Sequence, residues 1–166
     1  MIFTPPLPME KRWASPVEIK SMEEDGHFSG YASTYTPDRH KDVMVPGAFR
    51  GSLNAWRQDK KWPPLLWQHD AHVPLGLWRH MKEDRRGLFV VGQLLLDAPK
   101  AREIYAFLKK GAFCGLSIGF RSLVSRYDAA QQLRKIFQVD LMEISIVTLP
   151  ANPKAGIHHI KSLSPS

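Results

Sequence analysis

The spacing of apolar residues limits the fold of this chain more than any other feature, because most of it follows the two-residue period of a β-strand. The clearest pattern is L-F-V-V-G-Q-L-L-L, in which Gly92 is typical of a bulge or a tight bend. Strands are predicted over 17–22, 28–35, 63–68, 88–96, 116–124 and 135–149. The chain is therefore expected to be mainly β.

Two segments follow the helical period instead. Apolar residues share one face of a helix predicted over 47–56 and of a second helix over 99–110. Asp97 is the expected N-cap of the second helix, and Gly111 lies just past its end. Because the strands outnumber the helices and do not alternate with them, a doubly wound parallel sheet is disfavoured. The pattern predicts a mainly β (α+β) fold, a closed or nearly closed antiparallel β-barrel with a few surrounding helices.

The domain organisation is simple. A length of 166 residues fits one domain, and a hydrophobic fraction of 43% is enough for a packed core. Prolines near the start predict an irregular, flexible N-terminal arm over 1–16. A single domain is expected over 17–161, followed by a flexible C-terminal tail over 162–166.

The charge balance and the cysteine count restrict the partners and the compartment. Lysine and arginine number 23 against 16 acidic residues, a net charge of +7, which favours acidic partners or a basic, solvated surface. The single cysteine, Cys114, excludes a disulfide framework and a cysteine-rich zinc site. Neither a secretory signal nor an apolar run of membrane-spanning length is visible, so we expect a cytoplasmic protein without a membrane span.

The block G-L-S-I-G-F at 115–120 places Ser117 between two glycines. Its spacing matches the G-x-S-x-G nucleophile elbow, but here the predicted order is helix and then strand, the reverse of that elbow. Two interpretations stay open. Ser117 is either a structural serine in a glycine-bordered strand or a nucleophile that a substrate approaches closely.

The segment W-Q-H-D-A-H places His69 at the end of an apolar strand, where an imidazole is held rigidly. A metal site would need both His69 and His72. Asp70 or Asp42 would assist, but convincing third and fourth ligands are missing, so no bound metal is expected. His69 is then either a general base or a surface histidine.

Glu143 lies in the apolar run D-L-M-E-I-S-I-V, where an unpaired buried charge would be very costly. Strand alternation puts it on the same face as Ser145, so its carboxylate either faces solvent or orients a histidine. Together, Ser117, His69 and Glu143 would supply the nucleophile, the general base and the orienting acid of peptide hydrolysis through an acyl-enzyme.

Several motifs follow one another along the chain: G-Y-A-S, P-G-A-F, L-L-W-Q-H-D, L-K-K-G, G-L-S-I-G-F and L-M-E-I-S-I-V-T-L-P-A-N-P-K-A. In this ordered set, the chain resembles the prohead serine proteases of tailed bacteriophages, which mature the capsid. The resemblance implies that Ser117 is the nucleophile, His69 the catalytic histidine and Glu143 the acidic residue. It also implies a fold like that of the herpesvirus maturation protease, a barrel of about seven strands surrounded by helices.

The resemblance further implies a serine endopeptidase without a cofactor. Its expected substrates are scaffold or the scaffold-like arm of the major capsid protein, and the chain itself. Its place would be the host or bacterial cytoplasm, inside the immature procapsid of a phage, a prophage or a gene transfer agent. By analogy with the herpesvirus relatives, a homodimer is also suggested.

Two other functions stay open. The first is a non-enzymatic capsid assembly or scaffolding module, which needs the barrel but no aligned triad. The second, direct DNA binding driven by charge, ranks last because no recognition helix is evident, so nucleic acid is not expected as a specific ligand. An enzyme requires roughly 2.6–3.2 Å between Ser117 Oγ and a His69 nitrogen, whereas a separation beyond about 6 Å would favour the assembly module.

Overall fold

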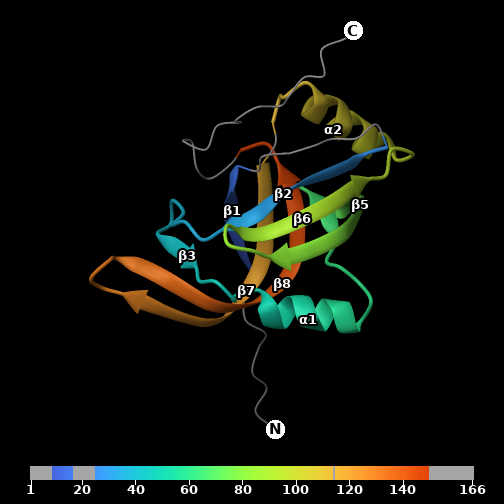
Figure 1. Ribbon diagram of the computed structural model, residues 1–166. Coiled ribbons are helices and arrows are strands. Elements are labelled where there is room, and N and C mark those ends of the chain that lie inside the picture. Colours follow the sequence, from blue (N-terminus) through green and yellow to red (C-terminus); the bar gives the residue numbers. More distant parts are fainter. Residues whose placement is uncertain (1–8, 17–24, 114, 150–166) are drawn as a thin grey trace.

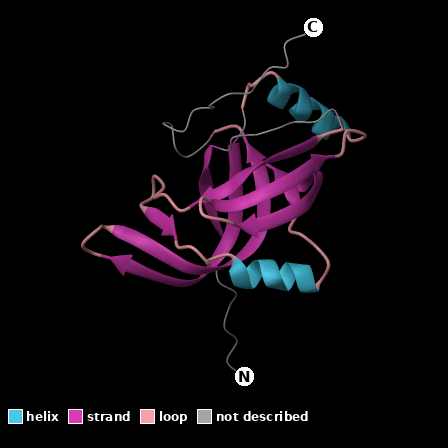
Figure 2. Cartoon of the chain, viewed as in Figure 1, coloured by secondary structure: helices cyan, strands magenta, loops and turns pink. Residues whose placement is uncertain are grey.

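A computed structural model describes residues 9–16, 25–113 and 115–149. In this part of the chain, eight strands form one sheet that curls into a half-barrel (Figure 1). Two helices lie at opposite ends of the sheet (Figure 2). The elements are β1 (Glu10–Pro16), β2 (His27–Thr34), β3 (Asp42–Met44), α1 (Arg50–Gln58), β4 (Leu65–Trp67), β5 (Asp70–Glu83), β6 (Gly87–Leu94), α2 (Pro99–Lys109), β7 (Gly115–Asp128) and β8 (Leu133–Val147).

The order of strands is β1-β7-β8-β4-β5-β6-β2. The short strand β3 stands outside this order and pairs with β8. The expectation of an antiparallel sheet is wrong at two places, because β3 and β4 both run parallel to β8. The chain leaves the sheet after β3, passes through α1 and returns as β4 in the same direction along β8. The spacing of apolar residues carries no information on strand direction, so the sequence did not reveal this crossover.

The sequence pattern did not predict the strand β5. Its buried residues Leu75, Trp78 and Met81 are three positions apart, a helix-like spacing. Two irregularities accompany this spacing: the pairing with β4 shifts register between Pro74 and Gly76, and the pairing with β6 shifts between Trp78 and His80. Opposite Trp78 lies Gly92, where an added Cβ would come within 2.6 Å of the Phe28 ring.

The predicted N-terminal arm is wrong for its second half, because residues 10–16 form the strand β1. This strand pairs with β7 from Glu10 opposite Phe120 to Pro16 opposite Gly115. β1 stands at the end of the strand order, where Pro16 is tolerated because only one side of the strand is in a ladder. The strand predicted over 17–22 and the tail over 162–166 lie outside the described residues.

Both helices occur where helical spacing predicted them. α1 begins at Arg50 instead of at position 47, because the chain turns first at Gly47, whose φ is +93°. α2 has nearly the predicted bounds, with Gly111 just past its end at φ +71°. Its N-cap is Ala98, without a side-chain cap, so the expected capping by Asp97 is wrong.

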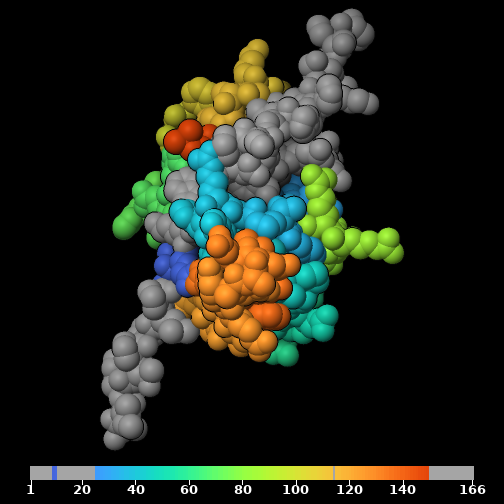
Figure 3. All heavy atoms as spheres, turned by 90° about the vertical axis from the view of Figure 1, so that its left-hand side faces the viewer, coloured from blue at the N-terminus to red at the C-terminus, as the bar shows by residue number. Residues whose placement is uncertain are grey.

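The core lies inside the curl of the sheet, and apolar residues of both helices pack against it. The outer parts of β7 and β8 extend beyond this core as a long hairpin, drawn in orange at the centre of Figure 3. Close to the turn of this hairpin, Arg134 of β8 joins two other strands, since its guanidinium donates to Glu10 at 2.6 Å and to Asp42 at 2.7 Å. The inner parts of β7 and β8 carry Ser117 and Glu143.

Candidate active site

Ser117, His69 and Glu143 lie together in one chain of hydrogen bonds. The Nε2 of His69 is 2.7 Å from Ser117 Oγ, and its Nδ1 contacts Glu143 Oε1. The first distance falls within the range that nucleophile activation requires. The three side chains come from three parts of the chain, and the fold brings them to one place.

The pairing of strands explains this convergence. β7 and β8 are antiparallel neighbours, with Ser117 opposite Ser145 and Gly119 opposite Glu143. β4 adds to the other side of β8, with Trp67 beside Ile146. The turn that follows β4 therefore carries His69 over the middle of β8, within reach of both neighbours.

The turn between β4 and β5 holds the imidazole in place. It has two residues, Gln68 and His69, with φ values of 52° and 61°. Positive φ at both central positions defines a type I′ turn, which glycine and asparagine favour and which other residues adopt at a cost of about 1–3 kcal/mol each. The Gln68 N–H donates to the carbonyl of Ile146 at 3.0 Å, which ties the turn to β8.

Ser145 is a positioning residue that sequence reasoning missed as part of the site. Its hydroxyl accepts from the backbone N–H of His69 at 3.0 Å and donates to Glu143 Oε2 at 2.7 Å. One buried hydroxyl thus fixes both the turn and the carboxylate. The only signal in the sequence was the alternation that places Ser145 on the same face as Glu143.

Gly119 makes room for the carboxylate. A Cβ at this position would overlap Glu143 Oε1 and would lie 2.9 Å from its Cγ and Cδ. The second glycine of the G-x-S-x-G pattern is therefore required by the neighbouring strand. It does not form a nucleophile elbow, since Ser117 lies within β7 and not at a strand-to-helix turn.

The site is almost closed to solvent. The His69 and Glu143 side chains are 4% and 7% exposed, and Ser117 has no exposed surface. Burying a carboxylate is tolerated here because both oxygens have partners.

The contact with Glu143 also assigns the imidazole tautomer. A carboxylate accepts a hydrogen bond from Nδ1–H, which leaves the lone pair on Nε2 to accept from the Ser117 hydroxyl. This arrangement can remove the hydroxyl proton as Ser117 attacks a carbonyl carbon.

The other residues considered as metal ligands lie apart from this group. The side chain of His72 is 95% exposed beside Asp70, and Asp42 accepts from Arg134. Within the described ranges, no three histidine, cysteine or acidic side chains are grouped as a metal site would need. None of the helices described there has the length and apolar character to cross a bilayer.

Replacing Ser145 by alanine is expected to slow the reaction of Ser117 with a fluorophosphonate about tenfold to a hundredfold, because the turn and the carboxylate lose their common anchor. The folded state also loses a hydrogen bond to a buried carboxylate, worth about 1.5–3 kcal/mol. Labelling rates and thermal unfolding of the two proteins measure both effects. An unchanged labelling rate would show that Ser145 does not position the site.

The family model described as caudovirus prohead serine protease matches residues 15–165. The chain belongs to this family. The resemblance in the ordered motifs is therefore confirmed.

Two of the similar proteins are named prohead proteases, and a third is a capsid polyprotein. The chain is 34% identical to the prohead protease of Enterobacteria phage HK97 over 142 residues, which cover 84% of this chain and 62% of the relative. It is 29% identical to the prohead protease of Escherichia phage T5, covering 89% of this chain and 69% of the relative. A match to the capsid polyprotein of Pseudomonas phage PAJU2, at 31% identity, covers 90% of this chain but 22% of that protein.

A solved structure supports the fold. The capsid assembly protease of bacteriophage T4 superposes with a TM-score of 0.64 over 87% of this chain and 98% of that chain, at 11% identity. At this identity the likeness concerns the fold alone. It agrees with the mainly β half-barrel and its two described helices.

Proposed function

We propose that this chain is a serine endopeptidase that acts in capsid maturation. The observation that carries the proposal is the 2.7 Å contact between Ser117 Oγ and His69 Nε2, backed by Glu143 on the other ring nitrogen, in a chain of the prohead protease family. The geometry supports an enzyme over a non-enzymatic assembly module, because such a module has no need of an aligned, buried triad.

The proposed reaction proceeds through an acyl-enzyme. His69 Nε2 takes the hydroxyl proton while Ser117 Oγ bonds to the substrate carbonyl carbon. The protonated imidazole then gives this proton to the departing amine as the peptide C–N bond breaks. Water attacks the ester in the second half, again with His69 as base, and releases Ser117. Glu143 stabilises the imidazolium throughout without taking its proton.

The proposed substrates are scaffold or the scaffold-like arm of the major capsid protein, and the chain itself. The match to a phage capsid polyprotein supports a capsid-linked substrate. The proposed place of action is the interior of the immature procapsid, in a host or bacterial cytoplasm. A phage, a prophage or a gene transfer agent is the proposed source, and a homodimer the proposed assembly.

We also propose that the sheet closes into the barrel of about seven strands known from herpesvirus maturation proteases. In support, the two ends of the strand order, β1 and β2, lie close to one another. No ladder joins these two strands within the described ranges.

Two assays test the proposed function. A fluorophosphonate should label the purified chain at Ser117, which intact-mass and peptide analysis would locate. Co-expression with the capsid protein of the same genome should shorten the capsid protein or the protease on a denaturing gel. A chain that binds the capsid protein, without being labelled and without cleaving it, would instead be an assembly module.

A further inference from the structure

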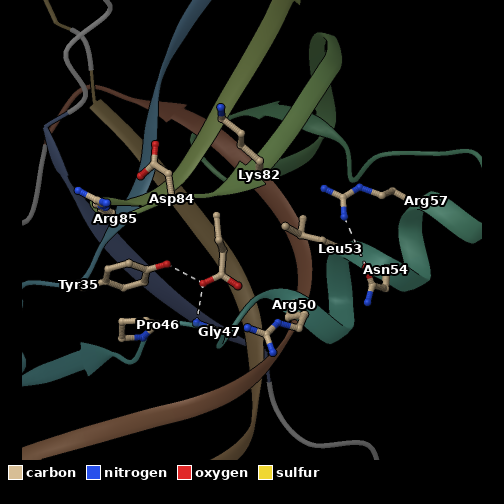
Figure 4. A pocket seen from close by; sticks show the side chains of 11 residues that line it. Tyr35, Pro46, Gly47, Arg50, Leu53, Asn54, Arg57, Lys82, Asp84 and Arg85 are labelled. Atoms are coloured by element: carbon tan, nitrogen blue, oxygen red, sulfur yellow. Dashed lines mark hydrogen bonds between the residues drawn. The ribbon is translucent and has the colours of Figure 1, made fainter.

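A basic hollow lies at the end of β5 opposite to the catalytic turn. It has a volume of about 740 Å³ and opens between α1 and the turn that follows β5. Figure 4 shows that Arg50, Arg57, Lys82 and Arg85 surround it. These cations come from α1, from β5 and from the loop after β5. None of the triad residues lines it.

Within the described part of the chain, none of the four cations forms an ion pair. The Lys82 ammonium lies over the Phe89 ring at 5.7 Å, and its charge acts on the nearby Asp84 carboxylate. Arg57 donates to the carbonyl of Met81 at 3.0 Å and lies over the Trp62 ring. By contrast, Lys135 pairs with Asp128 at 2.9 Å. Four cations and two carboxylates line this hollow, and the excess of positive charge produces a local potential that attracts an anionic ligand.

Two carboxylates also line the hollow, but their oxygens are used within the fold. Glu83 accepts from the Tyr35 hydroxyl at 2.6 Å and from two backbone N–H groups before α1. Burial, followed by this hydrogen bond to Glu83, raises the pKa of Tyr35, which therefore remains a donor at neutral pH. Asp84 accepts from the Tyr31 hydroxyl at 2.6 Å and from two further backbone N–H groups. Neither carboxylate forms an ion pair with the four cations.

The basic surface continues beyond the hollow. A second, smaller depression of about 190 Å³ is lined by Arg57, Lys60, Lys61 and Trp62. Arg57 borders both depressions, and we call the two together the α1 groove.

We propose that the α1 groove binds an acidic peptide segment of the substrate, away from the bond that is cut. This inference rests on the proposed function, since it gives the protease a second contact with its substrate. From Asp70 to Glu83, β5 spans at most about 43 Å at 3.3 Å per residue. An extended peptide therefore needs about a dozen residues to join the α1 groove to the catalytic turn.

A polypeptide fits the groove better than nucleic acid does. Glu83 and Asp84 would repel a continuous phosphate backbone, whereas the carboxylates of a peptide can be spaced to meet only the cations. Bases would need a free aromatic face. The two aromatic residues of the groove are already engaged. The Trp62 ring packs against the core, with the Arg57 guanidinium 5.7 Å from the ring centroid, and the Tyr35 hydroxyl donates to Glu83.

Peptide binding tests the proposal. The full chain with Ser117→Ala would be titrated against a fluorescent twelve-residue peptide rich in glutamate and aspartate, with anisotropy as the readout. Reversing two groove cations, Arg50→Glu and Arg85→Glu, should weaken binding at least about tenfold and reduce its salt dependence. The matched control, Arg102→Glu with Arg126→Glu, changes the net charge equally on α2 and the outer hairpin. It should bind within about twofold of the parent.

Equal weakening by both pairs would overturn the proposal, because it would show attraction by overall charge. Tighter binding of an oligothymidylate of equal charge, through the same two arginines, would overturn it in favour of nucleic acid. If the reversed pair does not fold, Arg50→Gln with Arg85→Gln should still weaken binding more than Arg102→Gln with Arg126→Gln. Fluorophosphonate labelling of Ser117 in the groove variants tests the proposed function separately, because the groove does not touch the triad.

Discussion

Replacing Ser117 by alanine is expected to abolish cleavage of the capsid protein and of the chain itself, with a loss of about a thousandfold to a millionfold in rate. The reason is that the acyl-enzyme cannot form without the hydroxyl that His69 deprotonates. Co-expression on a denaturing gel and fluorophosphonate labelling of the purified protein measure the loss. His69→Ala should be about as inactive, because the members of such a triad act as one unit.

A matched control lies on the same strand. Ser125 of β7 is exposed on the outer hairpin, so Ser125→Ala should leave both cleavage and labelling unchanged. Thermal unfolding of Ser125→Ala should remain close to that of the parent because the lost hydroxyl is exposed, and a cooperative transition of Ser117→Ala would show that this variant is folded. Continued cleavage by Ser117→Ala would disprove the nucleophile assignment, and Cys114 would then be the next candidate to replace.

Gly119→Ala is expected to reduce the labelling rate about a hundredfold to ten-thousandfold, although the glycine carries no chemical group. The added Cβ would overlap the Glu143 carboxylate and displace it from His69. An imidazole without its orienting acid loses the correct tautomer, which explains an effect of this size. Overpacking should also lower the free energy of unfolding by about 1–3 kcal/mol.

A double-mutant cycle isolates the cause of this effect. With Glu143→Ala in place, the carboxylate is gone, so adding Gly119→Ala should change stability by less than about 0.5 kcal/mol. Chemical denaturation of the four proteins measures both differences. An equal cost of Gly119→Ala in the two backgrounds would mean that the glycine is needed for another reason.

Much of the fold could be predicted from the sequence, wherever a strand keeps its alternation. β6 was found because buried and less buried residues alternate along it, and α2 because its apolar stripe has no competing pattern. β5 was missed since its buried side chains are spaced by three, with register shifts around Leu75 and after Trp78. The parallel pairing of β4 with β8 was missed because direction depends on contacts far apart in the chain.

The candidate site, like the fold, was predicted from the sequence only in part. The order of motifs singled out Ser117, His69 and Glu143, and the structure brings them together. Motifs could not reveal what Ser145 and Gly119 do, because both act across the register between strands. The α1 groove was equally hidden, since its cations come from segments that have no common pattern.

The separation of the triad residues along the chain has a consequence for the timing of activity. Ser117 is 48 positions from His69, and His69 is 74 positions from Glu143. Pairings between such distant segments form late in folding, because the chain must close long loops before these contacts stabilise it. A nascent or half-folded copy therefore lacks a working triad.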